Sequence, residues 1–141
     1  MSDANAARAA LTGRWNLTEF KREFSDTREV IDVMGPAPSG TLSVSDDGYV
    51  AVLITAAGRT AETPPEKLFA TLMAYSGPCT VDAQRFITNV ELAWHPAWVG
   101  TQQVRNYTIA GDELRITTDE QTHPAYPGRL GRGILVWRRA V

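Results

Sequence analysis

Short apolar stretches alternate with clusters of turn residues along most of the chain, and this pattern predicts a protein built mainly of β-strands. The longest predicted strand covers Gly13–Phe24. Simple alternation along it would place Trp15 and Leu17 on one face and Phe20 and Arg22 on the other. Further strands are predicted at residues 29–34, 41–45, 49–55, 79–82, 85–94, 102–109, 113–118 and 134–138.

Tight turns join several of these strands. Asp46-Asp47-Gly48 and Ala110-Gly111-Asp112 each place glycine beside aspartate, which suits the positive φ that hairpin turns need. Because neighbouring strands are mostly joined in this way, we expect an all-β fold, a closed antiparallel up-and-down barrel of about eight to ten strands, since closure removes exposed sheet edges. A β-sandwich is the alternative architecture.

One short helix interrupts the strands. Thr63-Pro64-Pro65-Glu66 has the spacing of a capping box, with proline at the first helical position. Apolar residues follow at helical spacing, at Leu68, Phe69, Leu72 and Met73. Gly77 and Pro78 would end the helix, and we expect it to pack across one mouth of the barrel because it is too short to be stable alone. Residues 119–131 are predicted to form a loop whose glycine-rich end acts as a flexible lid.

The composition indicates one globular domain. The chain has 141 residues, of which 43% are hydrophobic, and this length allows a core without disulfides or metals. We expect residues 1–10 to be flexible or to form a short helical turn, and residues 11–141 to form the barrel. The net charge of −2 comes without a Lys/Arg cluster, so no nucleic-acid partner is expected. We find neither an apolar run of membrane-spanning length nor a signal-peptide pattern, which favours a cytoplasmic protein with no membrane partner.

Metal and cofactor chemistry finds little support in the sequence. Cys79 is the only cysteine, which excludes an internal disulfide, and it is either a nucleophile or, more simply, a half-buried thiol. His95 and His123 each lie beside a proline and match no metal-ligand spacing. We therefore expect no metal and no cofactor, with axial ligation of a haem as the remaining role for either histidine.

Four short segments carry a family resemblance. They are Gly13-Arg14-Trp15, Pro96-Ala97-Trp98-Val99-Gly100, Gly111-Asp112-Glu113-Leu114 and Leu135-Val136-Trp137-Arg138. In type and order they resemble the lipocalin-like domain family of the calycin group. The resemblance implies a barrel with a central pocket, and some barrels of this general kind act as cyclases or isomerases in specialised metabolism. The family often has a histidine in the strand before Pro-x-Trp-Val-Gly, where this chain has Thr88 and Asn89.

Polar residues that share a strand face are the candidates for pocket chemistry. Gln103, Arg105 and Tyr107 lie on one face of their predicted strand. Arg105 would hold a carboxylate, enolate or carbonyl oxygen of a ligand, or would pair with Glu91 or Glu19 to close the barrel floor. Tyr107 would donate a hydrogen bond or proton to a substrate, or simply line the wall. Glu91 would act as a general base if desolvated, or would lie at the surface or beside Arg105.

The other candidates are ligand-binding residues. Thr88 and Asn89 lie on opposite faces of one predicted strand, so alternation allows one of them to face the interior. Trp15, Trp94 and Trp137 are aromatic candidates for lining a pocket, and core packing is the simpler role for most of them.

Together these features favour a binding barrel whose central pocket holds a small apolar or aromatic molecule by shape and hydrogen bonds. The alternative is a cofactor-free cyclase or isomerase, with cycloaddition included, that acts on a specialised-metabolite intermediate. Arg105, Tyr107 and Glu91 would then be its catalytic residues. A filled barrel with a structural or interaction role is a third hypothesis. A homodimer is compatible with the pattern, because an open strand edge is easily paired.

Overall fold

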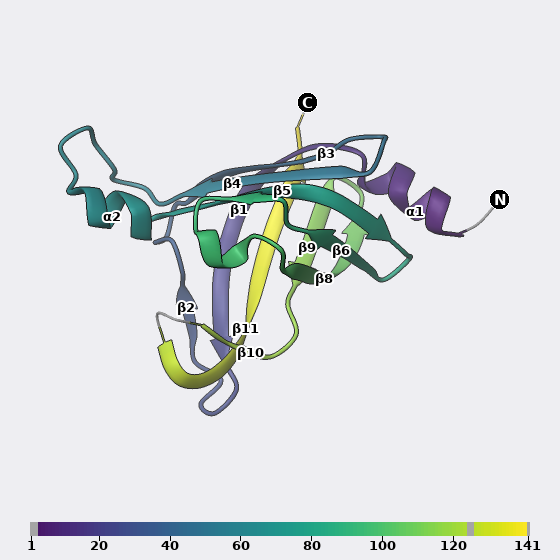
Figure 1. The fold of residues 1–141 in the computed structure, drawn as a ribbon. Helices are drawn as coiled ribbons and strands as arrows, with labels where there is room; N and C mark the ends of the chain where they lie inside the picture. Colours follow the sequence, from purple (N-terminus) through teal and green to yellow (C-terminus); the bar gives the residue numbers. More distant parts are fainter. Residues whose placement is uncertain (1–2, 124–125, 141) are drawn as a thin grey trace.

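Eight antiparallel strands close into a barrel in the computed structural model, which describes residues 3–123 and 126–140 (Figure 1). Going round the barrel, the strands are β1 (Gly13–Phe24), β3 (Ser39–Val44), β4 (Tyr49–Thr55), β5 (Leu72–Val81), β6 (Arg85–Asn89), β8 (Gln102–Ala110), β9 (Glu113–Thr117) and β11 (Tyr126–Arg139). β11 pairs with β1 and completes the circle. The structure therefore confirms the predicted fold class.

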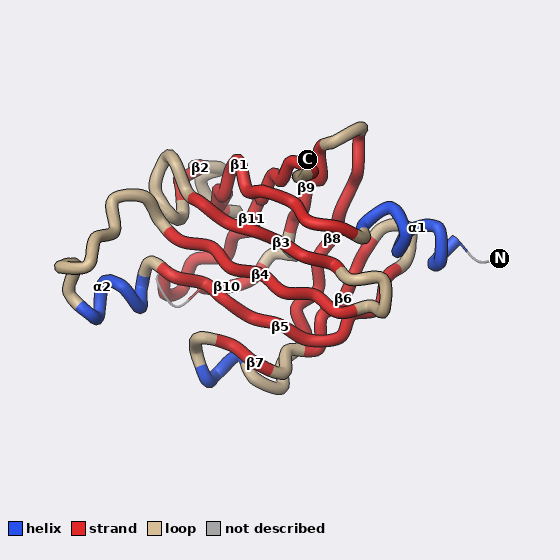
Figure 2. Tube along the Cα trace, turned by 90° about the horizontal axis from the view of Figure 1, so that it is seen from above, coloured by secondary structure: helices blue, strands red, loops and turns tan. Residues whose placement is uncertain are grey.

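Smaller elements lie around the barrel. They are α1 (Asp3–Leu11), β2 (Val30–Asp32), α2 (Pro65–Ala70), β7 (Leu92–Ala93), the 3₁₀ turn η1 (Pro96–Trp98) and β10 (Gln121–His123). β2 extends the sheet beside β1, β7 pairs with β5, and β10 pairs with β11. The two helices lie at opposite ends of the barrel, as Figures 1 and 2 both show.

The predicted hairpins form as expected. The β3–β4 turn closes through hydrogen bonds between Ser45 and Tyr49, and Gly48 in that turn has a φ of +85°. Gly111, between β8 and β9, has a φ of +61°. Both glycines adopt the left-handed conformation that other residues enter only with strain.

Strand β1 contains a bulge that the alternation rule did not predict. Its register with β11 shifts between Leu17 and Glu19, so Thr18 is an additional residue that faces outward together with Glu19. Consequently Phe20 and Arg22 lie on the same inner face as Trp15 and Leu17. The prediction that these two pairs face opposite sides was wrong, because one extra residue reverses the parity of everything after it.

The predicted helix is shorter than its apolar spacing suggested. α2 ends at Ala70, and Leu72 and Met73 belong to β5, where they pair with Thr55 and Ile54 of β4. No side chain caps the helix, so the capping box was also wrong. Instead the Thr63 hydroxyl accepts a hydrogen bond from the backbone of Thr60. Ladder pairing with β4 outweighed a helical propensity that a single turn could not stabilise.

Two other segment predictions need correction. Residues 119–131 are not a simple loop, because β10 and the start of β11 pair, with Gln121 opposite Gly131. Residues 124 and 125 within that segment lie outside the described residues. The strand predicted over residues 85–94 is broken into β6 and β7.

Helix α1 is anchored at one end of the barrel through its last residue (Figures 1 and 2). The segment expected to be flexible or to form a short helical turn is helical from residue 3, and Leu11 at the end of the helix is fully buried. The indole of Trp15 donates a 2.9 Å hydrogen bond to the Leu11 carbonyl oxygen. On its other side, the Arg139 guanidinium lies 4.1 Å from the Trp15 ring centroid and also donates to the carbonyl oxygens of Ala10 and Thr12. These contacts tie the helix to the first and last strands.

Candidate functional site

The barrel interior holds a cavity with about 70 Å³ of free space, and each of the eight barrel strands contributes at least one lining side chain. Most of the wall is apolar, including Phe20, Leu42, Val52, Ile54, Phe86, Ile116, Leu135 and Trp137. Leu11 and Trp15 beneath helix α1 are not part of the wall. Such a lining suits an apolar molecule held by shape.

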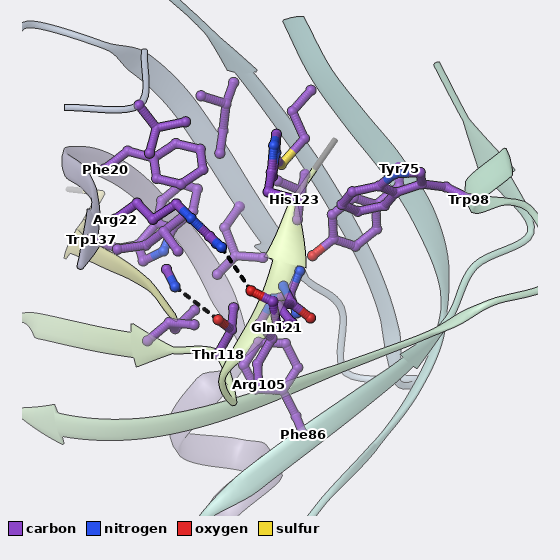
Figure 3. A pocket seen from close by; sticks show the side chains of 18 residues that line it. Phe20, Arg22, Tyr75, Phe86, Trp98, Arg105, Thr118, Gln121, His123 and Trp137 are labelled. Atoms are coloured by element: carbon purple, nitrogen blue, oxygen red, sulfur yellow. Dashed lines mark hydrogen bonds between the residues drawn. The ribbon is translucent and has the colours of Figure 1, made fainter. Parts of the chain in front are cut away.

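A group of polar side chains faces the same cavity (Figure 3). It consists of Arg22, Arg105, Thr118, Gln121 and His123. The described residues that line the cavity include no aspartate and no glutamate. The polar group therefore offers donors and positive charge, and little negative charge of its own.

Arg22 projects into the barrel from β1 and is 3% exposed. Its Nη2 donates hydrogen bonds to the carbonyl oxygens of Gln121, at 2.7 Å, and Arg129, at 3.3 Å, while its buried Nε has no acceptor among the described residues. The guanidinium lies 5.6 Å from the ring centroid of Phe24 and 5.9 Å from that of Tyr126. Burial lowers the pKa of Arg22, but a guanidinium remains charged at neutral pH.

Gly131 leaves space for the Arg22 side chain. A Cβ at this position of β11 would lie 3.1 Å from the Nε and the Cζ of Arg22 and 2.6 Å from the Glu23 carbonyl oxygen. Glycine thus lets the guanidinium lie directly against the β11 backbone.

Arg105 enters the cavity from β8 and is 8% exposed. Its Nη2 donates to Gln103 Oε1 at 3.1 Å and its Nη1 donates to the carbonyl oxygen of Val104 at 3.0 Å. The Gln103 amide is itself held, because its Nε2 donates to Thr101 Oγ1 at 3.0 Å. Gln103 therefore orients Arg105, and the remaining guanidinium donors are left for other acceptors.

Aromatic and imidazole rings form another part of the cavity wall. His123 is half-buried, and its ring centroid lies 5.7 Å from that of Tyr126. Burial, with a further contribution from Arg22, lowers the pKa of His123, which favours a neutral imidazole at neutral pH. The half-buried Trp98 of η1 lies 5.4 Å from Tyr75, ring to ring, and both line the cavity.

The structure places two of the residues predicted to form the site, Arg105 and Trp137, in the cavity wall. Gln103 is adjacent through its hydrogen bond to Arg105. Tyr107 faces the core beside Phe86, but its hydroxyl donates a 2.6 Å hydrogen bond to the Asp82 carbonyl oxygen. Burial, followed by the charge of Asp82, raises the pKa of Tyr107.

The other predicted site residues lie outside the cavity. Glu91 is exposed and accepts a hydrogen bond from the Tyr49 hydroxyl at 3.2 Å, so Arg105 does not pair with it. Asn89 is exposed and accepts one from Gln102 Nε2. Thr88 is fully buried but is not part of the cavity wall.

Two of the tryptophans predicted to line the pocket also lie away from the cavity. Trp15 packs beneath α1, and Trp94 packs against Trp98, with ring centroids 5.0 Å apart. Neither lines the cavity.

Sequence reasoning missed Arg22, Thr118, Gln121 and His123 as members of one site. The alternation of Phe20, Arg22 and Phe24 was visible, but the bulge concealed which face it occupied. Gln121 and His123 lay in a segment interpreted as a loop, and a strand pairing between distant segments gives no local signal.

The remaining candidate chemistry is outside the cavity or absent from the described chain. Burial raises the pKa of Cys79, against the opposing effect of Arg8, so its thiolate is disfavoured. His95 accepts a hydrogen bond from the Ala97 backbone through Nδ1. Among the described residues, no group of three His, Cys, Asp or Glu side chains is placed to hold a metal. Within the same residues, no helix has the length and apolar character needed to span a membrane.

Comparison with known proteins identifies a family and a relative. The family model described as a lipocalin-like domain matches residues 12–140. The 4'-hydroxy-3'-methoxypropiophenone carrier protein of Aspergillus oryzae is 37% identical to this chain over 76 residues. That alignment covers 48% of this chain and 66% of the carrier protein, slightly less than two thirds of its length.

Proposed function

The chain belongs to the lipocalin-like domain family, and we propose that it binds a small aromatic molecule, such as an aryl ketone, inside the barrel and carries it without chemical change. The cavity carries this proposal, because apolar side chains from the barrel surround it and a few polar groups face it. The Aspergillus oryzae relative supports the ligand class, since its name describes a carrier of an aryl ketone.

Ligand entry requires side-chain movement. The free space of about 70 Å³ is smaller than the roughly 150 Å³ of an apolar cavity that takes up benzene. Met73 and Trp98 both line the cavity and are half-buried, so their side chains have room to move and admit a ligand. Methionine has flexible torsions that allow such adjustment.

The placement of the predicted catalytic residues supports carriage over cyclisation or isomerisation. Arg105 lines the cavity, whereas the Tyr107 hydroxyl is bonded to a backbone carbonyl and Glu91 is exposed. A general acid or base must come within hydrogen-bond reach of the reacting atom. Arg105, a charged donor, suits holding an oxygen of the ligand.

A binding titration with 4'-hydroxy-3'-methoxypropiophenone tests the proposal. Trp98 and Trp137 line the cavity, so binding should quench tryptophan fluorescence in a saturable manner. After prolonged incubation, chromatography should recover the ketone unchanged. Conversion of the ketone into a product would overturn the carrier assignment, and the absence of saturable binding would overturn this ligand class.

Two substitutions on one strand locate the binding. Val52 faces the cavity, whereas its neighbour Leu53 is 47% exposed on the outside of β4. Val52→Phe should fill the cavity and abolish binding, and Leu53→Phe should leave the affinity within about twofold of the original, because an outward substitution changes little. Equal effects of the two substitutions would show that the ligand binds elsewhere.

A further inference from the structure

We infer that the ligand is bound as an anion: an apolar or aromatic molecule carrying one ionised oxygen, such as a phenolate, enolate or carboxylate, which lies against Arg22 and Arg105. This inference rests on the proposed function, because it defines the chemistry of the ligand in the same cavity. It adds a charge requirement that the apolar wall alone does not imply.

The first argument is the burial of two positive charges in one cavity. Arg22 is 3% exposed and Arg105 is 8% exposed, and both line the same space. Removing a charged group from water is costly unless an opposite charge and hydrogen bonds replace the lost hydration. Proteins therefore bury arginine mainly where a carboxylate or another anion meets it.

The second argument is that no carboxylate among the described residues pairs with either arginine. The ion pairs of the described residues involve Lys21, Arg28, Arg129 and Arg132, all of them partly exposed, and neither Arg22 nor Arg105 is among them. The described cavity wall contains no acidic side chain. The hydrogen bonds of both arginines within the described chain go to neutral amide and carbonyl oxygens.

The third argument is that donors remain for a ligand. The buried Nε of Arg22 has no acceptor among the described residues. Arg105 is fixed on one side by Gln103 and Val104, through one hydrogen bond from each terminal nitrogen. A guanidinium has five N–H donors, so each of these two retains capacity for an oxygen anion.

The two buried arginines lie on strands that are not neighbours in the barrel. Arg22 lies on β1 and Arg105 on β8, and β11 and β9 intervene on the shorter way round the barrel. Both nevertheless line one cavity, as Figure 3 shows. An acidic group on a ligand that fills this space meets positive charge from two sides, while its apolar body contacts the opposite wall.

The pair 4-nitrophenol and 4-nitroanisole tests this inference. The two molecules have the same ring, but only the phenol can ionise, and its phenolate absorbs at a longer wavelength than the neutral form. At a pH one unit below the pKa of free 4-nitrophenol, we expect the protein to bind the phenolate, with the phenolic proton released to the buffer. The phenolate band should grow as protein is added, and the phenolate should bind at least about tenfold more tightly than the neutral phenol, which lowers the apparent pKa of the bound probe by at least about one unit.

Three variants connect the spectral change to the arginines. Arg22→Met and Arg105→Met retain an unbranched apolar side chain without the charge, and each should reduce the phenolate preference at least about threefold. Arg115→Met, on the exposed side of β9, is the matched control and should leave it unchanged. The titration of the unmodified protein is decisive by itself if either buried variant fails to fold.

Each outcome separates this inference from the proposed function. If both probes bind equally and the phenol stays neutral, the charge requirement is wrong while the binding function stands. If neither probe quenches tryptophan fluorescence at saturating concentration, the cavity does not bind single aromatic rings and the proposed function falls. If the phenolate preference persists in both folded methionine variants, the anion lies elsewhere.

Discussion

Replacing Leu11 by alanine tests whether the end of helix α1 is anchored in the barrel core. Leu11 is 0% exposed and belongs to the core, so the substitution removes a completely buried side chain. The lost burial and the cavity left behind should lower the free energy of unfolding by about 3 kcal/mol. For a chain of this size, that loss corresponds to a fall in Tm of roughly 10 °C.

Thermal unfolding followed by circular dichroism measures this loss, and Leu92→Ala is the matched control. Leu92 is 68% exposed, so its substitution should change the free energy of unfolding by no more than about 0.5 kcal/mol. Because Leu11 does not line the cavity, Leu11→Ala should also leave the affinity for 4-nitrophenol within about twofold of the original. Equal stability of the two variants would refute the anchoring role of Leu11, and a large loss of affinity would show that the cavity reaches this end.

Three further predictions concern single positions. Thr88 is fully buried and its hydroxyl has no hydrogen-bond partner among the described residues. Thr88→Val should therefore raise the free energy of unfolding, measured in urea, by about 1 kcal/mol. A decrease in the free energy of unfolding by about that amount would show that the hydroxyl has a partner. A Cβ on Gly77 would lie 1.9 Å from the Asn89 carbonyl oxygen, so Gly77→Ala should cost about 4 kcal/mol or more and sharply reduce Tm, whereas an unchanged Tm would refute this close approach. Burial and then Arg22 lower the pKa of His123 from 6.5, so the unfolded chain binds a proton on this imidazole at a higher pH than the folded chain does. The stability that the neutral imidazole contributes is complete above pH 6.5 and is lost as the pH falls below 6.5. His123→Gln should remove this loss, and parallel curves of Tm against pH for the two proteins would contradict the prediction.

The barrel was predictable from the sequence because its signals are local. Glycine in the β3–β4 and β8–β9 turns and the alternation within each strand specify hairpins without knowledge of the whole fold. The helix was less predictable, because Leu72 and Met73 fit both a helical stripe and a strand. Pairing with Thr55 and Ile54 decided between these states, and those partners lie far away in sequence.

The candidate site was predictable only in part. Arg105 was identified because its strand is regular and its neighbours alternate cleanly. Arg22 was assigned to the wrong relative face, since Thr18 adds a residue and no glycine marks the bulge. Gln121 and His123 reach the cavity through the pairing of β10 with β11, which the sequence pattern did not reveal.

The bulge in β1 also affects how related chains should be compared. Two versions of this strand would place the same residues on the inner face. One is the strand seen here, with Thr18 as an additional outward residue, and the other is a regular strand that is one residue shorter. An insertion or deletion at this point would therefore leave the order of inward residues intact while changing the number of residues between Trp15 and Arg22. A search pattern with fixed spacing after Gly13-Arg14-Trp15 would find proteins of one length and overlook equivalent proteins of the other. If positions are instead counted from the residues of β11 that pair with β1, the arginine equivalent to Arg22 can be identified in proteins with either strand length.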